Sequence, residues 1–205
     1  MGITIHYRGR IDNIEDVDQL SCEIKEFAKI LDWDIREWNE NWHLPNSAAL
    51  EKEGDKLEIS GHVPIRGVSV IPHPGCEPLF LTFNNKGTLA SSINMVMMAE
   101  DEIETDRVWL STKTQFASAD IHAALIKLLR FVKSKYISNL EVHDDGRYWE
   151  SEDMAVLEEL FTRVGSAIDS LPDSLNLITK KELKDRTPEE IADFIEDIIR
   201  KKFGK

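Results

Sequence analysis

Apolar and polar residues alternate at the start of the chain in the way that predicts a half-buried β-strand. Between Ile3 and Arg10, the apolar side chains of Ile3, Ile5 and Tyr7 alternate with polar ones. Further strand-like segments are expected at 56–60, 68–71, 79–83, 88–98 and 108–116, after a polar break at 51–55. The segment 33–42, rich in Trp and charge, is expected to form a strand and a turn. Asn84 to Gly87 has the residue types of a hairpin turn, because Asn and Gly tolerate a positive φ.

Apolar residues spaced three and four apart predict three helices in the body of the chain. The first begins at a capping-box pattern formed by Asp12 and Glu15, and its apolar face carries Ile14, Val17, Leu20, Ile24, Phe27 and Leu31. The second is capped by Ser118 and carries Ile121, Leu125, Leu128, Leu129 and Val132. The third is capped by Ser151 and carries Met154, Leu157, Phe161 and Val164. We expect each apolar face to pack against a core.

Two further patterns complete the prediction. The stretches 140–143 and 147–150 flank Asp144, Asp145 and Gly146, a combination typical of a β-hairpin. Near the C-terminus, Thr187 to Glu190 supplies an N-cap, a proline at the first helical position and a capping-box Glu. The predicted helix that follows carries Ile191, Phe194, Ile195, Ile198 and Ile199 on one face.

This order of elements predicts an α+β fold. Short hairpin links favour a mainly antiparallel sheet with helices packed on a face. We expect a single α+β domain over 1–178 and a C-terminal helical appendage over 179–205, which packs on the domain or on a second subunit. The units at 3–42 and 107–150 share a strand–helix–strand layout, from which two related halves are a hypothesis.

The composition is that of a folded, acidic protein. Of the 205 residues, 41% are hydrophobic and 31% are charged, and the formal net charge is -13. A protein that binds the phosphate backbone needs the opposite field, so nucleic acid and anionic membranes are disfavoured as partners. The negative charge suits electrostatic steering toward a basic protein partner.

Several absences favour a soluble, cytoplasmic protein. No apolar run approaches the ~20 residues that cross a bilayer, and the N-terminal segment lacks a signal-peptide pattern. Cys22 lies in a helical pattern and Cys76 in a loop, so a disulfide framework is not expected. No cofactor is expected either, because the common dinucleotide and phosphate-binding motifs are missing.

Cysteine and histidine chemistry has one weak candidate. His73 and Cys76 stand three apart in a loop with two prolines and a glycine, and together they could chelate zinc. A structural zinc site needs about four ligands, and no second pair with ligand spacing is present. The alternative is that Pro72 to Cys76 forms a tight turn, and no metal is then expected. Cys76 could also act as a nucleophile if a histidine lay beside it.

Two groups of polar residues could form a site. Asp144, Asp145, Glu150, Glu152 and Asp153 gather beside His143 and Tyr148, and this group either binds a hard cation or supplies a turn and a helix start. Lys113 and Gln115 share one face of the predicted strand, with His122 a turn into the next helix. These three side chains could receive an anion, or Lys113 could protect an exposed strand edge.

The 109–150 segment resembles a family of uncharacterised bacterial cytoplasmic proteins. The resemblance is carried by Lys113 to Phe116, by His122, by Leu128 and Leu129, by Leu140 to Val142, and by Asp145 to Glu150. It implies no activity. It marks Lys113, Gln115, His122, Asp145, Tyr148 and Trp149 as a candidate binding surface or pocket.

Two interpretations of function follow. The first is a non-enzymatic protein-binding module, with an immunity or antitoxin-like role as one form of it. Its surface would be aromatic and charged and would include Trp38, Trp42, Tyr148 and Trp149. The alternative is a small hydrolase or transferase whose pocket is built from Lys113, His122 and the turn from His143 to Asp145. The protein is expected to be a monomer, or a homodimer through the C-terminal helix.

Overall fold

The computed structural model describes residues 2–53, 56–100, 104 and 108–176. The chain divides into two compact units, with the boundary between Phe161 and Thr162. The predicted α+β class is confirmed, because helices accompany sheets whose strand pairs are all antiparallel. Within the described residues, no helix is long and apolar enough to span a membrane.

The first sheet is built around the N-terminal strand. β1 (Thr4–Arg8) is the central strand, flanked by β7 (Leu110–Lys113) and β8 (Glu141–Asp144) in the order β7-β1-β8. Ile5 lies opposite Thr112 on one side and opposite Asp144 on the other. Because side chains alternate along a strand, Ile5, Thr112 and Asp144 all point to the buried face.

The second sheet has the order β2-β5-β6, formed by Asp34–Asn39, Arg66–Ile71 and Leu79–Phe83. A separate hairpin joins β3 (Ala49–Glu53) to β4 (Lys56–Ser60). The phenol of Tyr7 connects the two sheets: it donates to the Phe80 carbonyl at 3.1 Å and accepts from the Phe80 amide at 2.8 Å. The buried side chain of Tyr7 therefore binds both the amide and the carbonyl of Phe80, a residue of the other sheet.

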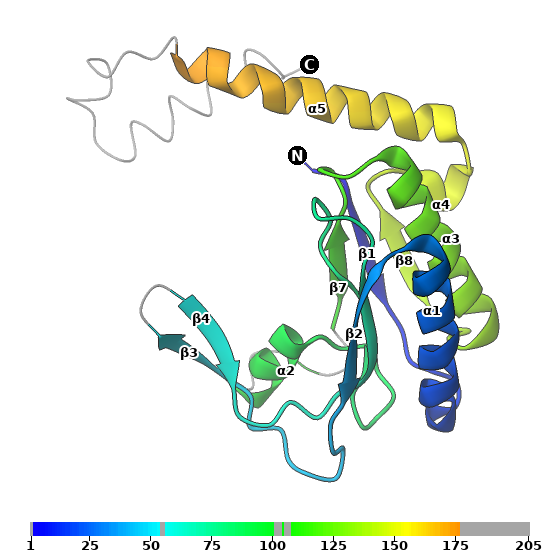
Figure 1. Ribbon diagram of the computed structural model, residues 1–205, viewed down its shortest axis with the longest axis vertical. Coiled ribbons are helices and arrows are strands. Elements are labelled where there is room, and N and C mark those ends of the chain that lie inside the picture. Colours follow the sequence, from blue (N-terminus) through cyan, green and yellow to red (C-terminus); the bar gives the residue numbers. More distant parts are fainter. Residues whose placement is uncertain (1, 54–55, 101–103, 105–107, 177–205) are drawn as a thin grey trace. The chain divides into compact units, whose positions relative to one another are not determined.

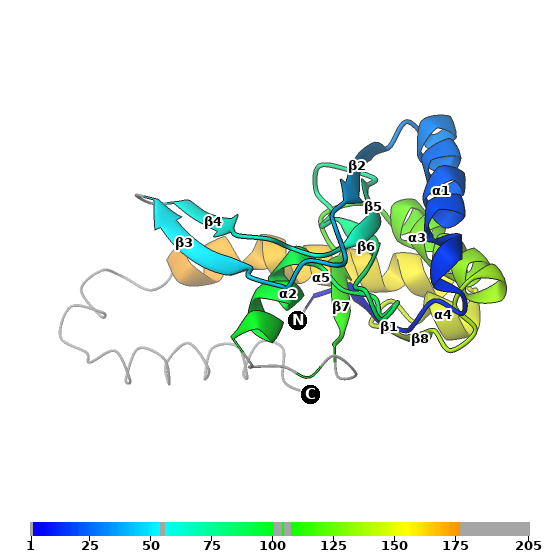
Figure 2. The same ribbon diagram turned by 90° about the horizontal axis from the view of Figure 1, so that it is seen from below.

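The described part of the chain also forms six helical segments. They are the 3-10 turn η1 (Ile14–Asp16), α1 (Val17–Leu31), α2 (Ser92–Ala99), α3 (Ala119–Lys135), α4 (Tyr148–Ser151) and α5 (Met154–Asn176). Helices α1 and α3 lie together on one side of the strands (Figures 1 and 2). Between them and the sheets lies the main core, which includes Ile5, Leu20, Val70, Leu125 and Leu129.

Three predicted elements are wrong. Residues 92–99 form α2 rather than a strand, because Ser91 and Asn94 make a capping box that starts a helix. The predicted polar break at 51–55 is wrong for residues 51–53, because 49–53 form the strand β3. The hairpin at Asp144 to Gly146 is also wrong, because 148–151 form α4 and not a returning strand.

Other expectations hold or are refined. The turn at Asn84 to Gly87 is confirmed, with Gly87 at φ 77° and its amide donating to the Asn84 carbonyl. On the first helix Phe27 and Leu31 are exposed rather than buried. The topology places the two strand–helix–strand units differently, since β1 and β2 lie in separate sheets while β7 and β8 share one. The predicted helix after Thr187 lies outside the described residues.

Candidate functional site

A buried polar network links three elements behind the first sheet. The Thr114 hydroxyl lies 2.7 Å from Nδ1 of His122 on α3. On the other side of the ring, Nε2 lies 2.9 Å from a carboxylate oxygen of Asp144, at the end of β8. The side chains of His122 and Asp144 are both 0% exposed. The network therefore joins the end of β7 to α3 and β8 in the interior.

Asp144 also organises the turn that follows it. Its carboxylate accepts the amides of Gly146 at 2.7 Å and of Trp149 at 2.9 Å. Burial acts to raise the pKa of Asp144, but the contact with His122 and these amides outweigh it, so the pKa lies below its ordinary value. This charged acceptor explains why the chain turns into α4 where the sequence pattern predicted a hairpin.

Gly146 is required at its position by close packing. A Cβ atom there would lie 2.6 Å from Nε2 of His122 and 2.8 Å from a methyl carbon of Leu157. Any side chain at 146 would push into the His122 ring or into α5. Glycine is therefore needed at 146 because of close packing against His122 and Leu157, and not because of a hairpin turn.

Thr114, His122 and Asp144 resemble a hydroxyl–imidazole–carboxylate arrangement, but no substrate can reach them. All three residues are fully or almost fully buried, and the oxygens of Asp144 are occupied by backbone amides. A catalytic hydroxyl must meet its substrate directly. We therefore assign the network a structural role, in which it fixes the 144–149 segment.

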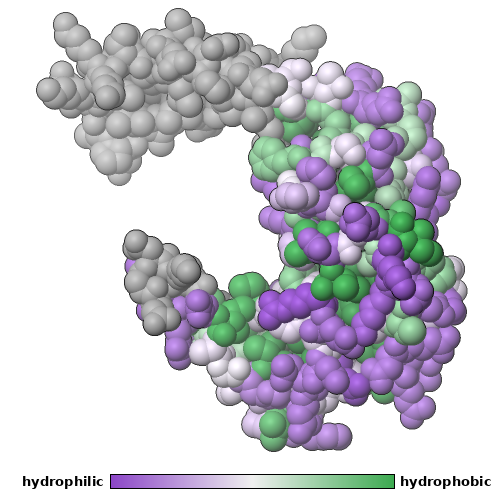
Figure 3. Space-filling view, in the orientation of Figure 1, coloured by the Kyte–Doolittle hydropathy of each residue, from purple (hydrophilic) through white to green (hydrophobic). Residues whose placement is uncertain are grey.

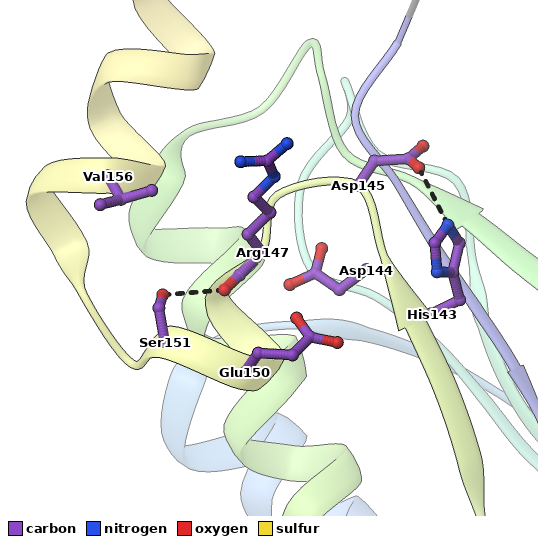
Figure 4. Close-up of a pocket in the computed structure, with 7 residues that line it drawn as sticks. All are labelled: His143, Asp144, Asp145, Arg147, Glu150, Ser151 and Val156. Carbon is purple, nitrogen blue, oxygen red and sulfur yellow. Dashed lines mark hydrogen bonds and ion pairs between the residues drawn. The ribbon is translucent and has the colours of Figure 1, made fainter.

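An open pocket of about 710 Å³ adjoins this segment on the surface. Figure 4 shows that it is lined from β8, the turn after it, α4 and the first turn of α5. The lining residues are His143, Asp144, Asp145, Arg147, Glu150, Ser151 and Val156. We refer to it as the Arg147 pocket.

Arg147 stands in an unusual backbone conformation at this pocket. Its φ of 58° lies in the left-handed region, which costs a residue with a side chain about 1 kcal/mol or more. Two hydrogen bonds from Ser151, one from its amide and one from its hydroxyl, hold the Arg147 carbonyl. The guanidinium makes no hydrogen bond or ion pair within the described part of the chain.

Two imidazoles share the Asp145 carboxylate at the edge of the pocket. Nε2 of His143 lies 3.7 Å and Nε2 of His6 lies 3.9 Å from its oxygens, and the two rings stack with centroids 6.1 Å apart. His143 is 72% exposed, so this group is open to solvent. Among the described residues, no group of three or more His, Cys, Asp or Glu is arranged to hold a metal ion.

The pocket continues into the polar face of the first sheet. This outer face is formed by alternate residues of the three strands and by the residues that adjoin β7 and β8, Trp109 and Asp145. The strand residues are Thr4, His6, Arg8, Ser111, Lys113, Glu141 and His143. At one end, the Arg8 guanidinium lies 4.6 Å from the centre of the Trp109 ring and 2.8 Å from Glu141. All of these residues are exposed or partly exposed, and they include the residue types common at protein interfaces.

The six residues singled out by the resemblance fall in four separate places. Lys113 and Asp145 belong to the outer face, while Gln115 lies against Gly2 with a buried amide oxygen. His122 and Tyr148 are buried. Trp149 lines a shallow cleft on the other side of α4, with Arg130 at 5.2 Å and Lys133 at 5.9 Å from its ring centre. These side chains therefore do not share one pocket.

The aromatic surface expected around four residues is also divided. Tyr148 is buried, and Trp38, Trp42 and Trp149 are half-buried in different parts of the fold. Arg36 stacks on Trp38 and Arg66 on Trp42, at 4.0 and 5.0 Å from the ring centres. Stacked arginines cover much of these rings, so each is less available than sequence alone suggested.

The loop with His73 and Cys76 forms a turn closed by its own groups. Nδ1 of His73 accepts the Gly75 amide, and the His73 carbonyl accepts the Cys76 amide, both at 2.9 Å. Burial raises the pKa of the Cys76 thiol to about 12. The thiol is therefore protonated at neutral pH and is a poor nucleophile. Both cysteines are free.

Sequence reasoning missed three residues of this region. The sequence indicates Thr114 and Arg147 only as members of predicted strands and of the resembling segments, and His6 only as a polar position of the first strand. The signal for His6 was its place on the polar face of a strand, which pairing with β8 then sets beside His143. No local pattern indicates Arg147, because its conformation depends on the buried carboxylate of Asp144.

Comparison with known proteins found no matching family model, no matching curated protein and no matching solved structure. The resemblance of the 109–150 segment to a bacterial family therefore stays a prediction. What can be said of function depends on the geometry described above.

Proposed function

We propose that this chain is a non-enzymatic protein-binding module. Its recognition surface is the outer face of the first sheet together with the Arg147 pocket, which meet at His143 and Asp145. The observation that carries the proposal is the uncommitted guanidinium of Arg147, held in a strained backbone conformation at an open pocket. A glycine would adopt that conformation at lower cost, so the arginine side chain itself has a use.

The backbone around the pocket favours recognition because it is fixed in advance. Hydrogen bonds from Gly146, Trp149 and Ser151 hold the segment on either side of Arg147. A pre-organised surface loses less entropy on binding, which improves affinity for a given set of contacts. Trp109 and Arg8, stacked at the far end of the outer face, are the residue types that dominate binding energy in protein interfaces.

The negative net charge of the chain favours a basic protein as the partner. The net charge of -13 attracts cations over a distance, while the outer face itself carries both signs and supplies the specific contacts. An immunity or antitoxin-like role is one form of such binding, in which the acidic protein covers a basic enzyme. The buried position of His122 and Asp144 supports binding over catalysis, since the best-placed acid–base pair is closed to substrates.

The test begins with capture from the source cells and ends with purified components. A captured basic protein is purified, and its affinity for the wild-type chain is compared with that for Arg147→Ala, Trp109→Ala and, as a control on the exposed side of α3, Lys127→Ala. Loss of a central contact costs about 2 kcal/mol or more, or roughly thirtyfold in affinity. We expect this for Arg147→Ala and Trp109→Ala and little change for Lys127→Ala. Equal affinities for all three variants would contradict the proposed surface.

A small hydrolase or transferase is the second candidate, favoured by the exposed His143 and Asp145 beside Arg147. An imidazole near a carboxylate can act as a general base, and a guanidinium can hold an anionic substrate. The pocket would then turn over esters or phosphoesters, and His143→Ala would abolish the activity while Lys127→Ala would not. Absence of turnover by the wild-type protein across such a panel removes this candidate.

A further inference from the structure

One edge of the second sheet is open. β2 is the terminal strand of the order β2-β5-β6, and every residue from Asp34 to Asn39 is exposed except the half-buried Trp38. Within the described chain, β2 pairs with no strand but β5. An exposed edge of this kind presents unpaired amides and carbonyls that can bind another strand.

Exposed apolar residues lie next to this edge. Ile35 points to the side of the sheet where α1 lies, because Glu37, two residues on, contacts Lys25 of α1 at 2.6 Å. On the same side, the last turns of α1 expose Phe27, Leu31 and Ile30, the last to 77%. Figure 3 shows hydrophobic surface at the end of α1 that leads into β2. We call β2 and these three residues the edge patch.

We propose that the edge patch binds a second copy of this chain, with β2 paired antiparallel to its counterpart about a two-fold axis. Two antiparallel strands of one sheet are related by an axis perpendicular to that sheet. Such an axis keeps each side chain on its own face, so it must pass beside a residue that pairs with its own copy. Near the end of β2 that follows α1, the first three residues inside the strand are the candidates: Ile35, Arg36 and Glu37.

Charge selects among the three. An axis at Arg36 would oppose two guanidiniums, and an axis at Glu37 would oppose two carboxylates, both of which are unfavourable. An axis at Ile35 sets the two Ile35 side chains against each other. It also pairs Asp34 with Arg36 of the other copy, twice, since the contact is repeated by symmetry. The strand is therefore self-complementary in this register.

The position of the exposed apolar end of α1 also fits the register with the axis at Ile35. Ile35 stands near the start of β2, which directly follows α1, so an axis at Ile35 lies beside the C-terminal end of α1. The apolar ends of the two α1 helices then flank the axis on one side of the joined sheet. Phe27, Ile30 and Leu31 are covered by their counterparts, which removes apolar surface from water.

The dimer is tested by sedimentation of the full chain over a wide concentration range, against a monomer mass of 23.5 kDa. We expect the wild-type protein to dimerise as its concentration rises. Asp34→Arg converts both ion pairs into repulsions and should weaken the dimer about tenfold or more. The double variant D34R/R36D exchanges the charges and should restore it. Asp120→Arg, the same substitution on α3 away from the patch, should leave it unchanged.

Ile30→Glu provides a second variant, because a side chain this exposed contributes little to folding, and circular dichroism checks that each variant is folded. It should also weaken the dimer. A protein that stays monomeric at every concentration overturns the proposal. So does a dimer that survives both Asp34→Arg and Ile30→Glu, since it must then use another surface, such as the segment after Asn176. Neither outcome bears on binding at the Arg147 pocket, which uses different residues.

Discussion

Replacing Asp144 by asparagine tests the buried network, because the change keeps the shape and removes the charge. One carboxylate oxygen accepts a hydrogen bond from the Gly146 amide, and the other accepts one from the Trp149 amide. Nε2 of His122 lies next to the oxygen that Gly146 binds. An amide has one accepting oxygen, so in either orientation its NH2 group faces a backbone amide that also donates. Leaving a buried donor unsatisfied costs about 1–3 kcal/mol, and the lost contact with His122 adds to it. We expect the free energy of unfolding to fall by about 2–4 kcal/mol at neutral pH.

The pH dependence of this loss provides a second readout. The folded-state pKa of Asp144 lies below its ordinary value of 3.8. The charged carboxylate therefore stabilises the fold above that value, and this contribution disappears as the pH falls through the folded-state pKa. Asparagine does not titrate. The difference in the free energy of unfolding between the wild-type protein and Asp144→Asn should therefore shrink as the pH is lowered below 3.8.

Urea unfolding followed by circular dichroism measures both effects. Asp145→Asn is the matched control, since this neighbouring carboxylate is partly exposed and accepts only long contacts from two imidazoles. We expect the control to change stability by less than about 0.5 kcal/mol. If Asp144→Asn and Asp145→Asn lose equal stability, or if the loss for Asp144→Asn does not depend on pH, the reasoning on the network is refuted.

Three further predictions follow from the same structure. Gly146→Ala should lower the melting temperature, because its Cβ would overlap His122 and Leu157; Gly165→Ala, which meets nothing within 4 Å, should raise it through better helix propensity. Arg147→Gly should keep or slightly raise stability by relieving the positive φ, yet weaken partner binding; a fall in stability of more than about 1 kcal/mol would contradict the assigned strain. In a thiol-labelling assay at mildly alkaline pH, exposed Cys22 should react quickly and Cys76, with its pKa of about 12, slowly, which Cys22→Ser makes visible by leaving only the slow phase.

Local patterns predicted most of the elements correctly. The alternation in β1 and the Ser118 cap of α3 depend on neighbours in sequence, and both are confirmed. The error at 147–150 arises because a side chain distant in sequence decides the local structure. Residues 147–150 follow turn residues typical of a hairpin, yet α4 forms there because Asp144, which contacts buried His122, binds the amide of Trp149. No pattern within the segment contains that information.

The candidate site shows the same division. His143 and Asp145 were indicated by their place in a polar turn, and both line the Arg147 pocket. His6 lies beside them only because β1 pairs with β8. His122 is buried, because its position on α3 directs its side chain toward Asp144. Residue type predicted which side chains could do chemistry, whereas topology determined which of them face solvent.

The central position of β1 has a consequence for how the chain acquires its structure during synthesis. Thr4 pairs with Lys113 and Ile5 with Asp144, so both neighbours of β1 are made more than a hundred residues after it. Until then, the first strand leaves the ribosome with two unpaired edges and an apolar face. Contacts this distant in sequence slow folding, because a long loop must close before they form. β1 is thus translated well before both of its partners and is among the last strands to be completed, and it is the part that a nascent-chain chaperone would most usefully protect.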